Sequence, residues 1–312
     1  MYKFDIFCDS GANIPEELIQ KYDIKVIPFT VNVDGEEISC SSDGTPYAAV
    51  AKKFYDKMRQ GAAISTSLVN ADSIIEILKP TLEEGKDAIL TFISSGISGT
   101  FNQAKEAQAR LKEIYPDRKV FVFDSANASM GEGLQVVQIA RLRDLGQSVE
   151  SCAEWVADNA YKINSFLTVG DLKYLRKTGR ISMTVAIAGT ILNIKPVLTA
   201  DGGENAKIVF FDKARGRKKA LSALAEAFER NAIDPASHPV AICHADAEDD
   251  ANDLAEMIKA KGATEIIMEY YDMCTGSHVG PGTVALFFYG KDRREGKTEK
   301  GKLFRKTAKQ TT

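Results

Sequence analysis

The chain has 312 residues, of which 44% are hydrophobic and 27% are charged, with a formal net charge of -3 at pH 7. This composition is typical of a folded globular protein and excludes a disordered chain, a membrane-spanning chain and a strongly basic nucleic-acid-binding protein. The five cysteines are scattered and form no Cys-X-X-Cys pair, which argues against a disulfide framework and a zinc site. The first residues resemble a strand rather than a signal peptide, so we expect a cytoplasmic protein with no nucleic-acid partner and no metal.

The first half of the chain alternates strand and helix patterns. Short apolar runs predict strands over residues 2–8, 25–33, 88–93 and 119–124. Apolar residues at helical spacing predict helices over residues 15–22, 47–60, 73–82, 101–115 and 133–145. This alternation favours a mostly parallel sheet with helices on both faces. Ligands of such sheets bind at the carboxyl ends of the strands, so we expect the site there.

The segment after the third predicted strand joins four hydroxyl side chains and two glycines to the start of a helix. Its polar and glycine members are Ser94, Ser95, Gly96, Ser98, Gly99 and Thr100. A helix start has unpaired N–H groups, and with these hydroxyls it describes a pocket for a phosphate or a carboxylate. Ser125 follows the next strand in the same way. The simpler alternative is that these side chains only cap helices, since no phosphate-binding fingerprint is present.

The second half of the chain has a mixed order of elements. Strands are predicted over residues 165–169, 195–200, 206–211, 240–244, 265–271 and 284–289. Helices are predicted over 149–161, 183–193, 217–231 and 247–261, and residues 172–182 are expected to form a short helix and a turn. This order predicts an α+β fold with a mixed or antiparallel sheet. We expect a first domain at residues 1–162, a second at 163–290 and a basic tail at 291–312. The tail is either simply solvated or makes transient contact with an anionic membrane surface.

Two arginines and one histidine of the second half are candidates for a polar site. Arg180 and Arg215 lie in turn-like segments, where a guanidinium can offer fixed donors to a carboxylate or phosphate. His278 lies in a glycine-rich segment that predicts a turn over residues 276–282. The alternatives are two solvated arginines and a structural histidine.

Short polar motifs are spread along the whole chain in one order. They are Asp9 and Ser10, Thr66 and Ser67, the run 94–100, Asp124 and Ser125 with the run 129–133, and the segments 172–182, 192–196 and 278–282. Together they resemble the DegV family of bacterial fatty-acid-binding proteins from about residue 3 to residue 290. One departure is that the family's Thr-Ser-Gln-Pro-Ser segment keeps only its first two residues here.

This resemblance implies a two-domain α/β protein that buries one long-chain fatty acid in a tunnel between the domains and needs no cofactor. Such proteins are similar to the non-catalytic binding subunit of bacterial fatty acid kinase, which presents the acyl carboxylate to a separate ATP-dependent kinase subunit to form acyl phosphate. The matching motifs imply that Thr66 and Ser98 hold the carboxylate. The supporting residues are expected to be Ser67, Ser94, Ser95, Gly99, Ser125, Arg180, Arg215 and His278.

The tunnel walls are expected from the apolar helix at residues 183–193 and from Ile97, Ile187 and Leu192, whose alternative is ordinary core. Each methylene buried there contributes about 0.8 kcal/mol to binding. The sequence contains no P-loop, so phosphoryl transfer has to come from a partner. The alternative function is an enzyme that acts on a small phosphorylated or carboxylated substrate, with His278 as the acid or base.

Overall fold

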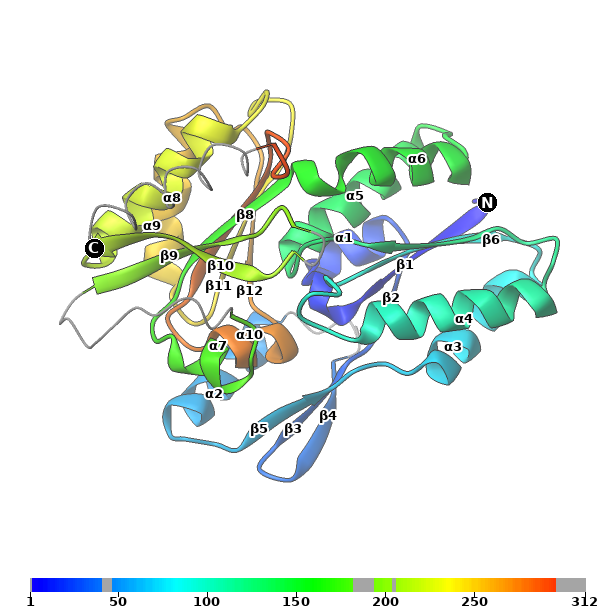
Figure 1. Ribbon diagram of the computed structural model, residues 1–312, viewed down its shortest axis with the longest axis horizontal. Helices are drawn as coiled ribbons and strands as arrows, with labels where there is room; N and C mark the ends of the chain where they lie inside the picture. The colour runs from blue at the N-terminus through cyan, green and yellow to red at the C-terminus, as the bar shows by residue number, and fades with distance from the viewer. Residues whose placement is uncertain (1, 41–46, 182–193, 204–205, 296–312) are drawn as a thin grey trace, which may run out of the picture.

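Residues 2–40, 47–181, 194–203 and 206–295 are described in a computed structural model of the chain (Figure 1). Their strands form three sheets, of four, six and three strands. The predicted helix at residues 183–193 and the tail beyond residue 295 lie outside the described residues. Within the described part of the chain, no helix combines the length and the apolar character needed to cross a bilayer.

The first sheet is parallel throughout and has helices on both faces, as predicted. Its strand order is β2-β1-β6-β7, formed by β1 (Phe4–Asp9), β2 (Ile24–Ile27), β6 (Asp87–Phe92) and β7 (Val120–Asp124). One face packs against α3 (Ala71–Glu83) and α4 (Thr100–Ile114), and the other against α5 (Met130–Asp144) and α6 (Val149–Asn159) (Figure 1). The short helices η1 (Ser10–Ala12) and α1 (Glu16–Lys21) connect β1 to β2.

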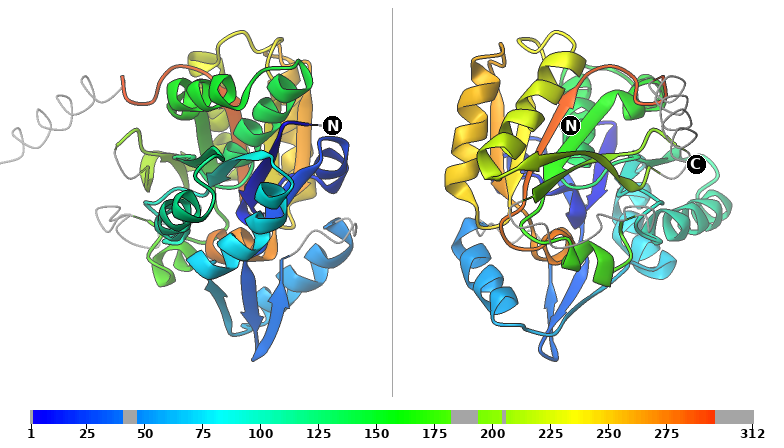
Figure 2. Two further views of the ribbon diagram at one scale, coloured as in Figure 1. Left: turned by 90° about the vertical axis from the view of Figure 1, so that its right-hand side faces the viewer. Right: turned by 60° about the vertical axis from the view of Figure 1, so that its left-hand side comes forward.

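The second sheet is mixed, which confirms the predicted class of the second half. Its order is β10-β9-β8-β13-β11-β12, formed by β8 (Ile163–Thr168), β9 (Ile194–Ala200), β10 (Ile208–Arg215), β11 (Val240–His244), β12 (Ile266–Tyr270) and β13 (Val284–Tyr289). Only β11 and β12 pair in parallel. Helices α8 (Arg217–Asn231) and α9 (Glu248–Lys259) lie side by side on its outer face (Figure 2). The turn η2 (Ala160–Lys162) leads into β8.

Helix α5 joins the two large sheets. It contacts β1 and β6 of the first sheet and β8, β11 and β13 of the second. Its side chains are therefore buried on nearly every side, and they include the carboxyl of Glu132. Burial raises the pKa of Glu132 well above its usual value, because the core disfavours the charged form of this carboxyl.

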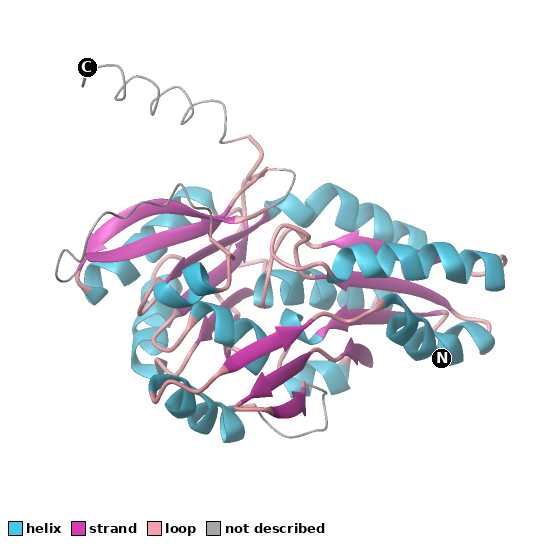
Figure 3. Ribbon diagram, turned by 60° about the horizontal axis from the view of Figure 1, so that its bottom comes forward, coloured by secondary structure: helices cyan, strands magenta, loops and turns pink. Residues whose placement is uncertain are grey.

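The third sheet is a small antiparallel one that the sequence analysis missed. Its order is β4-β3-β5, formed by β3 (Thr30–Val33), β4 (Glu36–Ser39) and β5 (Ile64–Ser67). The single strand predicted over residues 25–33 was wrong, because Pro28 has no N–H and the N–H of Phe29 donates to Ser10 Oγ at 3.0 Å. The two halves of that predicted strand, β2 and β3, belong to different sheets. Figure 3 shows the strands of the three sheets as separate groups with helices between and around them.

Three further helices pack where the sheets meet: α2 (Ala48–Arg59), α7 (Lys173–Lys177) and α10 (Met273–Val279). The turn predicted over residues 276–282 was wrong in its first part, because residues up to Val279 continue α10. The Asp272 carboxylate starts this helix by accepting the N–H groups of Cys274 at 2.6 Å and Thr275 at 3.0 Å. The turn begins only at Gly280, whose φ of 81° is in the left-handed region.

Candidate functional site

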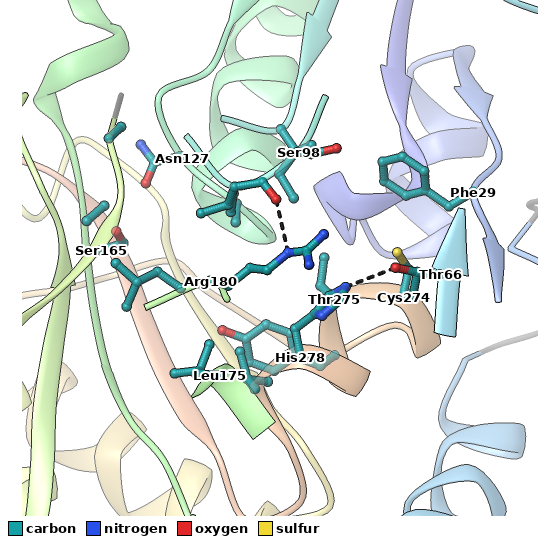
Figure 4. A pocket seen from close by; sticks show the side chains of 18 of the residues that line it. Phe29, Thr66, Ser98, Asn127, Ser165, Leu175, Arg180, Cys274, Thr275 and His278 are labelled. Atoms are coloured by element: carbon teal, nitrogen blue, oxygen red, sulfur yellow. Dashed lines mark hydrogen bonds between the residues drawn. The ribbon is translucent and has the colours of Figure 1, made fainter. Parts of the chain in front are cut away.

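A cavity of about 170 Å³ lies where the three sheets meet. Its wall is formed by β5, the loop between β6 and α4, the residues after α7, strand β8 and helix α10 (Figure 4). Most of the lining is apolar, with Phe29, Ile93, Ile97, Leu167, Leu175, Ile208, Val279 and Phe287 among the residues. The polar side chains in the wall are Thr66, Ser67, Ser98, Asn127, Ser165, Arg180, Thr275 and His278.

Thr66 and His278 form a hydrogen-bonded pair in this wall, although 212 positions separate them in the chain. Thr66 Oγ1 lies 3.1 Å from His278 Nε2. Burial, together with the positive charge of Arg180, lowers the pKa of His278 to about 4, so the imidazole is neutral at pH 7. If the proton is on Nε2, it donates to Thr66 Oγ1 and leaves the Thr66 hydroxyl proton available to a ligand.

Ser98 is also hydrogen-bonded to a neighbouring residue, Thr100. Its Oγ accepts the N–H of Thr100 at 3.3 Å and lies 3.0 Å from Thr100 Oγ1, at the start of α4. When the Thr100 hydroxyl donates to Ser98, the Ser98 hydroxyl proton is free to donate into the cavity. The cap interpretation and the anion-site interpretation of this serine are therefore compatible.

Arg180 supplies the positive charge of the cavity. Its Nε donates to the carbonyl of Ile97 at 3.1 Å, and Nη1 donates to the carbonyl of Thr178. These bonds fix the plane of the guanidinium, which points into the space between Ser98 and Thr66 (Figure 4). Within the described residues, no Asp or Glu carboxylate lies within salt-bridge distance of Arg180. A fixed guanidinium without a carboxylate partner is a site for an anion.

The structure brings together six of the predicted polar-site residues and leaves four outside the cavity. Thr66, Ser67, Ser98, Gly99, Arg180 and His278 line it, as does Ile97 of the predicted tunnel. Ser94, Ser95, Ser125 and Arg215 do not line it. Ile187 and Leu192 lie outside the described residues.

The four residues outside the cavity have local roles instead. Ser94 Oγ accepts the N–H of Gly96, and Ser125 Oγ donates to the carbonyl of Asn127. The N–H of Ser95 donates to the Asp124 carboxylate. Arg215 was predicted in a turn, but it ends strand β10 and is exposed. The bonds of Ser94 and Ser95 lie within the loop that carries Ser98.

Sequence reasoning missed three polar residues of the wall: Asn127, Ser165 and Thr275. The spacing of Asp272 and Thr275 is a helix-cap signal that could have placed Thr275 on a helix. Asn127 follows β7 closely and shares the strand-end signal of Ser125. Ser165 had no such signal, because a serine in the middle of a strand is common. Within the described ranges, no three His, Cys, Asp or Glu side chains lie together in a group that could hold a metal ion.

Two buried carboxyl groups beside the site make the stability of the fold depend on pH. Burial raises the pKa of Asp9 to about 7 and that of Asp272 to about 6. Above pH 6.5 the folded chain therefore holds protons that the unfolded chain, with carboxyl pKa values near 4, has already released. The contribution of these two groups to stability then falls as the pH rises, by about 1 kcal/mol between pH 6.5 and 8.

Urea denaturation at several pH values measures this loss. His278, with its pKa of about 4, and Glu132, with its raised pKa, also contribute over this window, so the part due to Asp9 is the difference between the wild type and a variant that lacks this carboxyl. The variant Asp9→Asn does not titrate at this position, so it should show a clearly smaller loss over the same window. An equal loss in the variant would contradict the assignment to Asp9.

Comparison with known proteins decides the family. A family model described as "Uncharacterised protein, DegV family" matches residues 3–291. The chain belongs to the DegV family. A DegV domain-containing protein of Clostridium perfringens is 37% identical over 294 residues, which cover 93% of this chain and 98% of that protein. One from Lactococcus lactis is 31% identical over 298 residues, covering 94% of this chain and 99% of that protein.

Solved structures of DegV proteins share this fold. A DegV family protein from Thermus thermophilus, described by its fatty acid binding, superposes with a TM-score of 0.80 at 26% identity and covers 93% of this chain and 100% of its own. DegV from Bacillus subtilis, described as a fatty acid binding protein, has a TM-score of 0.77 at 26% identity with the same coverage of 93% and 100%.

Proposed function

We propose that this DegV protein binds a long-chain fatty acid in the cavity where its three sheets meet. The carboxylate accepts hydrogen bonds from the hydroxyls of Thr66 and Ser98 and faces the guanidinium of Arg180, while His278 orients Thr66. The hydrocarbon chain lies along the apolar wall. Burial of the chain supplies affinity, at about 0.8 kcal/mol for each methylene, and the polar groups fix which end faces them.

The observation that carries this proposal is the combination of an apolar wall with one fixed cation that has no carboxylate partner among the described residues. An apolar cavity alone would not distinguish a fatty acid from an uncharged lipid. The guanidinium of Arg180, held by the Ile97 carbonyl and without a carboxylate partner among the described residues, selects an acid. The binding described for related DegV structures supports the same ligand class.

We also propose that the bound acid is presented to a separate ATP-dependent kinase that forms acyl phosphate. The polar end of the cavity adjoins the protein surface, since Leu68 lines the cavity and is 51% exposed, and Gly99 beside it is exposed as well. A partner can therefore approach the carboxylate while the chain remains buried. The alternative of an enzyme with His278 as the acid or base gains no support, because a pKa of about 4 leaves no imidazolium to act as an acid at pH 7 and makes the neutral imidazole a weak base.

The lipid carried by the protein tests the binding proposal. Protein purified from a bacterial host, denatured and extracted, should release close to one fatty acid per chain when the extract is measured by mass spectrometry. Absence of stoichiometric fatty acid would refute the proposal.

The variants Thr66→Ala and Ser98→Ala test the assignment of the carboxylate contacts. Each should lower the affinity for a fatty acid by about 10-fold or more, because each removes one hydrogen bond to a charged group. Titration of delipidated protein with a fluorescent fatty acid measures this. Ser222→Ala is the control, since Ser222 lies on α8 and bonds only the carbonyl of Lys218. Unchanged affinity in both site variants would show that the carboxylate binds elsewhere.

The kinase step has a separate assay. Loaded protein, ATP and a candidate kinase subunit from the same organism are mixed with hydroxylamine, which traps acyl phosphate as a hydroxamate. Hydroxamate should form only when both proteins are present. If none forms although the protein is loaded, the presentation step fails and the binding proposal stands.

A further inference from the structure

Two parts of the chain meet in the cavity wall on the side away from Thr66. Figure 4 shows Asn127 and Ser165 on this side and Thr66 on the other. Asn127 comes from the loop between β7 and α5 of the first sheet, whereas Ala200 comes from the end of β9 in the second sheet. We call the boundary between this loop and the end of β9 the seam. The loop is anchored to β8, since the Asn127 amide donates to the carbonyl of Ile163 at 3.0 Å, so an opening of the seam has to come from β9.

Arg293, in the segment after β13, bridges the seam with its guanidinium. On the loop side, Nη2 donates to the carbonyl of Ala126 at 2.8 Å, and Ala126 directly precedes Asn127. On the other side, Nη1 donates to the carbonyls of Ala200 at 3.3 Å and Asp201 at 3.1 Å. Strands β9 and β10 are the two outermost strands of their side of the second sheet. One side chain therefore ties the end of this outer hairpin to the first half of the chain.

The backbone around Arg293 also packs against the end of β9. A Cβ atom at Gly202 would clash with the carbonyl of Arg293, so the two backbones are in direct contact. The N–H of Arg293 donates to the carbonyl of Tyr161 at 3.0 Å, which fixes the point from which the side chain starts. A weaker second tie across the boundary is the hydroxyl of Ser94, which donates to the carbonyl of Ala206 at 3.4 Å.

The contacts of Arg293 favour the closed seam only moderately. Among the residues that the structure describes, Arg293 has no carboxylate within ion-pair distance, and its Nε is buried without a partner. Burial lowers the pKa of Arg293 to about 10, so the guanidinium is charged at pH 7 but has lost much of its hydration. A buried cation that bonds only carbonyls regains this hydration when it moves into water, which offsets the hydrogen bonds it leaves.

We propose that Arg293 is a latch: the seam opens when its guanidinium leaves the carbonyl of Ala126, and the acyl chain enters and leaves the cavity there. The inference rests on the proposed fatty acid site and adds how that site is loaded. Entry past Thr66, Ser98 and Arg180 would draw each methylene over groups that bind an anion. Entry through the seam places the chain against the apolar wall directly.

Exchange kinetics in Arg293→Gln test the proposal on the full-length chain. Association is measured by mixing delipidated protein with a fluorescent fatty acid, and dissociation by chasing the loaded protein with excess hexadecanoic acid. Both rate constants should rise about 10-fold or more, the effect of losing one hydrogen bond from a charged donor. The dissociation constant should stay within about 3-fold, because the closed state is destabilised equally with and without the acid.

Two further variants make the experiment specific. Arg294→Gln is the matched control, since Arg294 is the next residue, is exposed and pairs with Asp292, so both rate constants should stay within about 2-fold of the wild type. Gly202→Ala disturbs the latch through its backbone contact and leaves the guanidinium intact. It should also raise both rate constants. Thermal melts establish that each variant is folded, and if Arg293→Gln is not, Gly202→Ala alone decides.

The outcomes separate this inference from the proposed function. If the acid binds and both rate constants are unchanged in the folded variants, the acid passes elsewhere and the inference is wrong, while the fatty acid site stands. If only dissociation becomes faster, with a matching loss of affinity, Arg293 supports the binding wall and is not a latch, so the inference is also wrong. If no acid binds to the wild type, the proposed function fails and the inference with it.

Discussion

Replacement of Arg180 by glutamine should lower the affinity for a long-chain fatty acid by about 10- to 100-fold. The guanidinium is the one cation of the described cavity wall, and hydrogen bonds between charged groups contribute about 1.5 to 3 kcal/mol. Glutamine keeps much of the length and loses the charge. Arg180→Lys keeps the charge but loses the planar set of guanidinium donors, so its affinity should lie between those of the wild type and Arg180→Gln. Fluorescent fatty acid titration measures all three proteins.

Arg215→Gln is the matched control for this experiment. Arg215 is exposed at the end of β10 and does not line the cavity, so its replacement should leave the affinity within about 2-fold of the wild type. Thermal melts establish whether Arg180→Gln is folded, because Arg180 also bonds the carbonyls of Ile97 and Thr178. A folded Arg180→Gln protein with wild-type affinity would contradict the role of this residue.

The second large effect is expected from Gly276→Ala, which should destabilise the fold by about 3 kcal/mol through overpacking. A Cβ atom at Gly276 would lie 2.1 Å from Tyr55 Oη and 3.0 Å from Tyr55 Cζ. Tyr55 has no room to retreat, since it is fully buried and donates to the carbonyl of Tyr271 at 2.8 Å. The substitution would therefore push α10, which carries His278, away from α2. Urea denaturation measures the stability.

A second substitution identifies the clash as the cause. Tyr55→Phe removes Oη, so the double variant Tyr55→Phe with Gly276→Ala should be more stable than Gly276→Ala alone, although Tyr55→Phe by itself costs about 1 kcal/mol for the lost hydrogen bond. Gly146→Ala serves as the control, because a Cβ there meets nothing within 4 Å and only the positive φ of 80° opposes it. If the double variant is no more stable than Gly276→Ala, the contact with Tyr55 is not the reason.

The first sheet and the serine-rich loop after β6 are well predicted from the sequence because their signals are local. Apolar runs bounded by polar turns define β1, β6 and β7, and parallel pairing then brings the segments after β6 and β7 to one edge. Ser98 is identified because four hydroxyls within seven residues are more than a helix cap requires. The family resemblance adds Thr66 through its motif, whereas Arg180 and His278 are candidates already from the turn-like and glycine-rich segments that hold them.

The small sheet and the deep wall of the cavity depend on contacts that local patterns do not contain. Strand β5 has only four residues, and its register with β3 joins Thr66 to Val31. Four residues with mixed polarity give no periodic signal. Ser165 also has no signal in the sequence, since only the packing of β8 shows that this serine lines the cavity. Arg215 illustrates the opposite error, because a basic turn-like segment proved to be an exposed strand end.

The position of Thr66 on the small sheet, away from the strands that hold the rest of the site, has a thermodynamic consequence. Thr66, Ser98, Arg180 and His278 come from four distant stretches of the chain, and no one of the sheets supplies them all. An acid bound to them is thus a ligand of the native state only, and at 100 times its dissociation constant it would add about 2.7 kcal/mol to the free energy of unfolding. On the proposed function, loading and folding are linked equilibria, and a chain that releases its acid is less stable than the loaded chain.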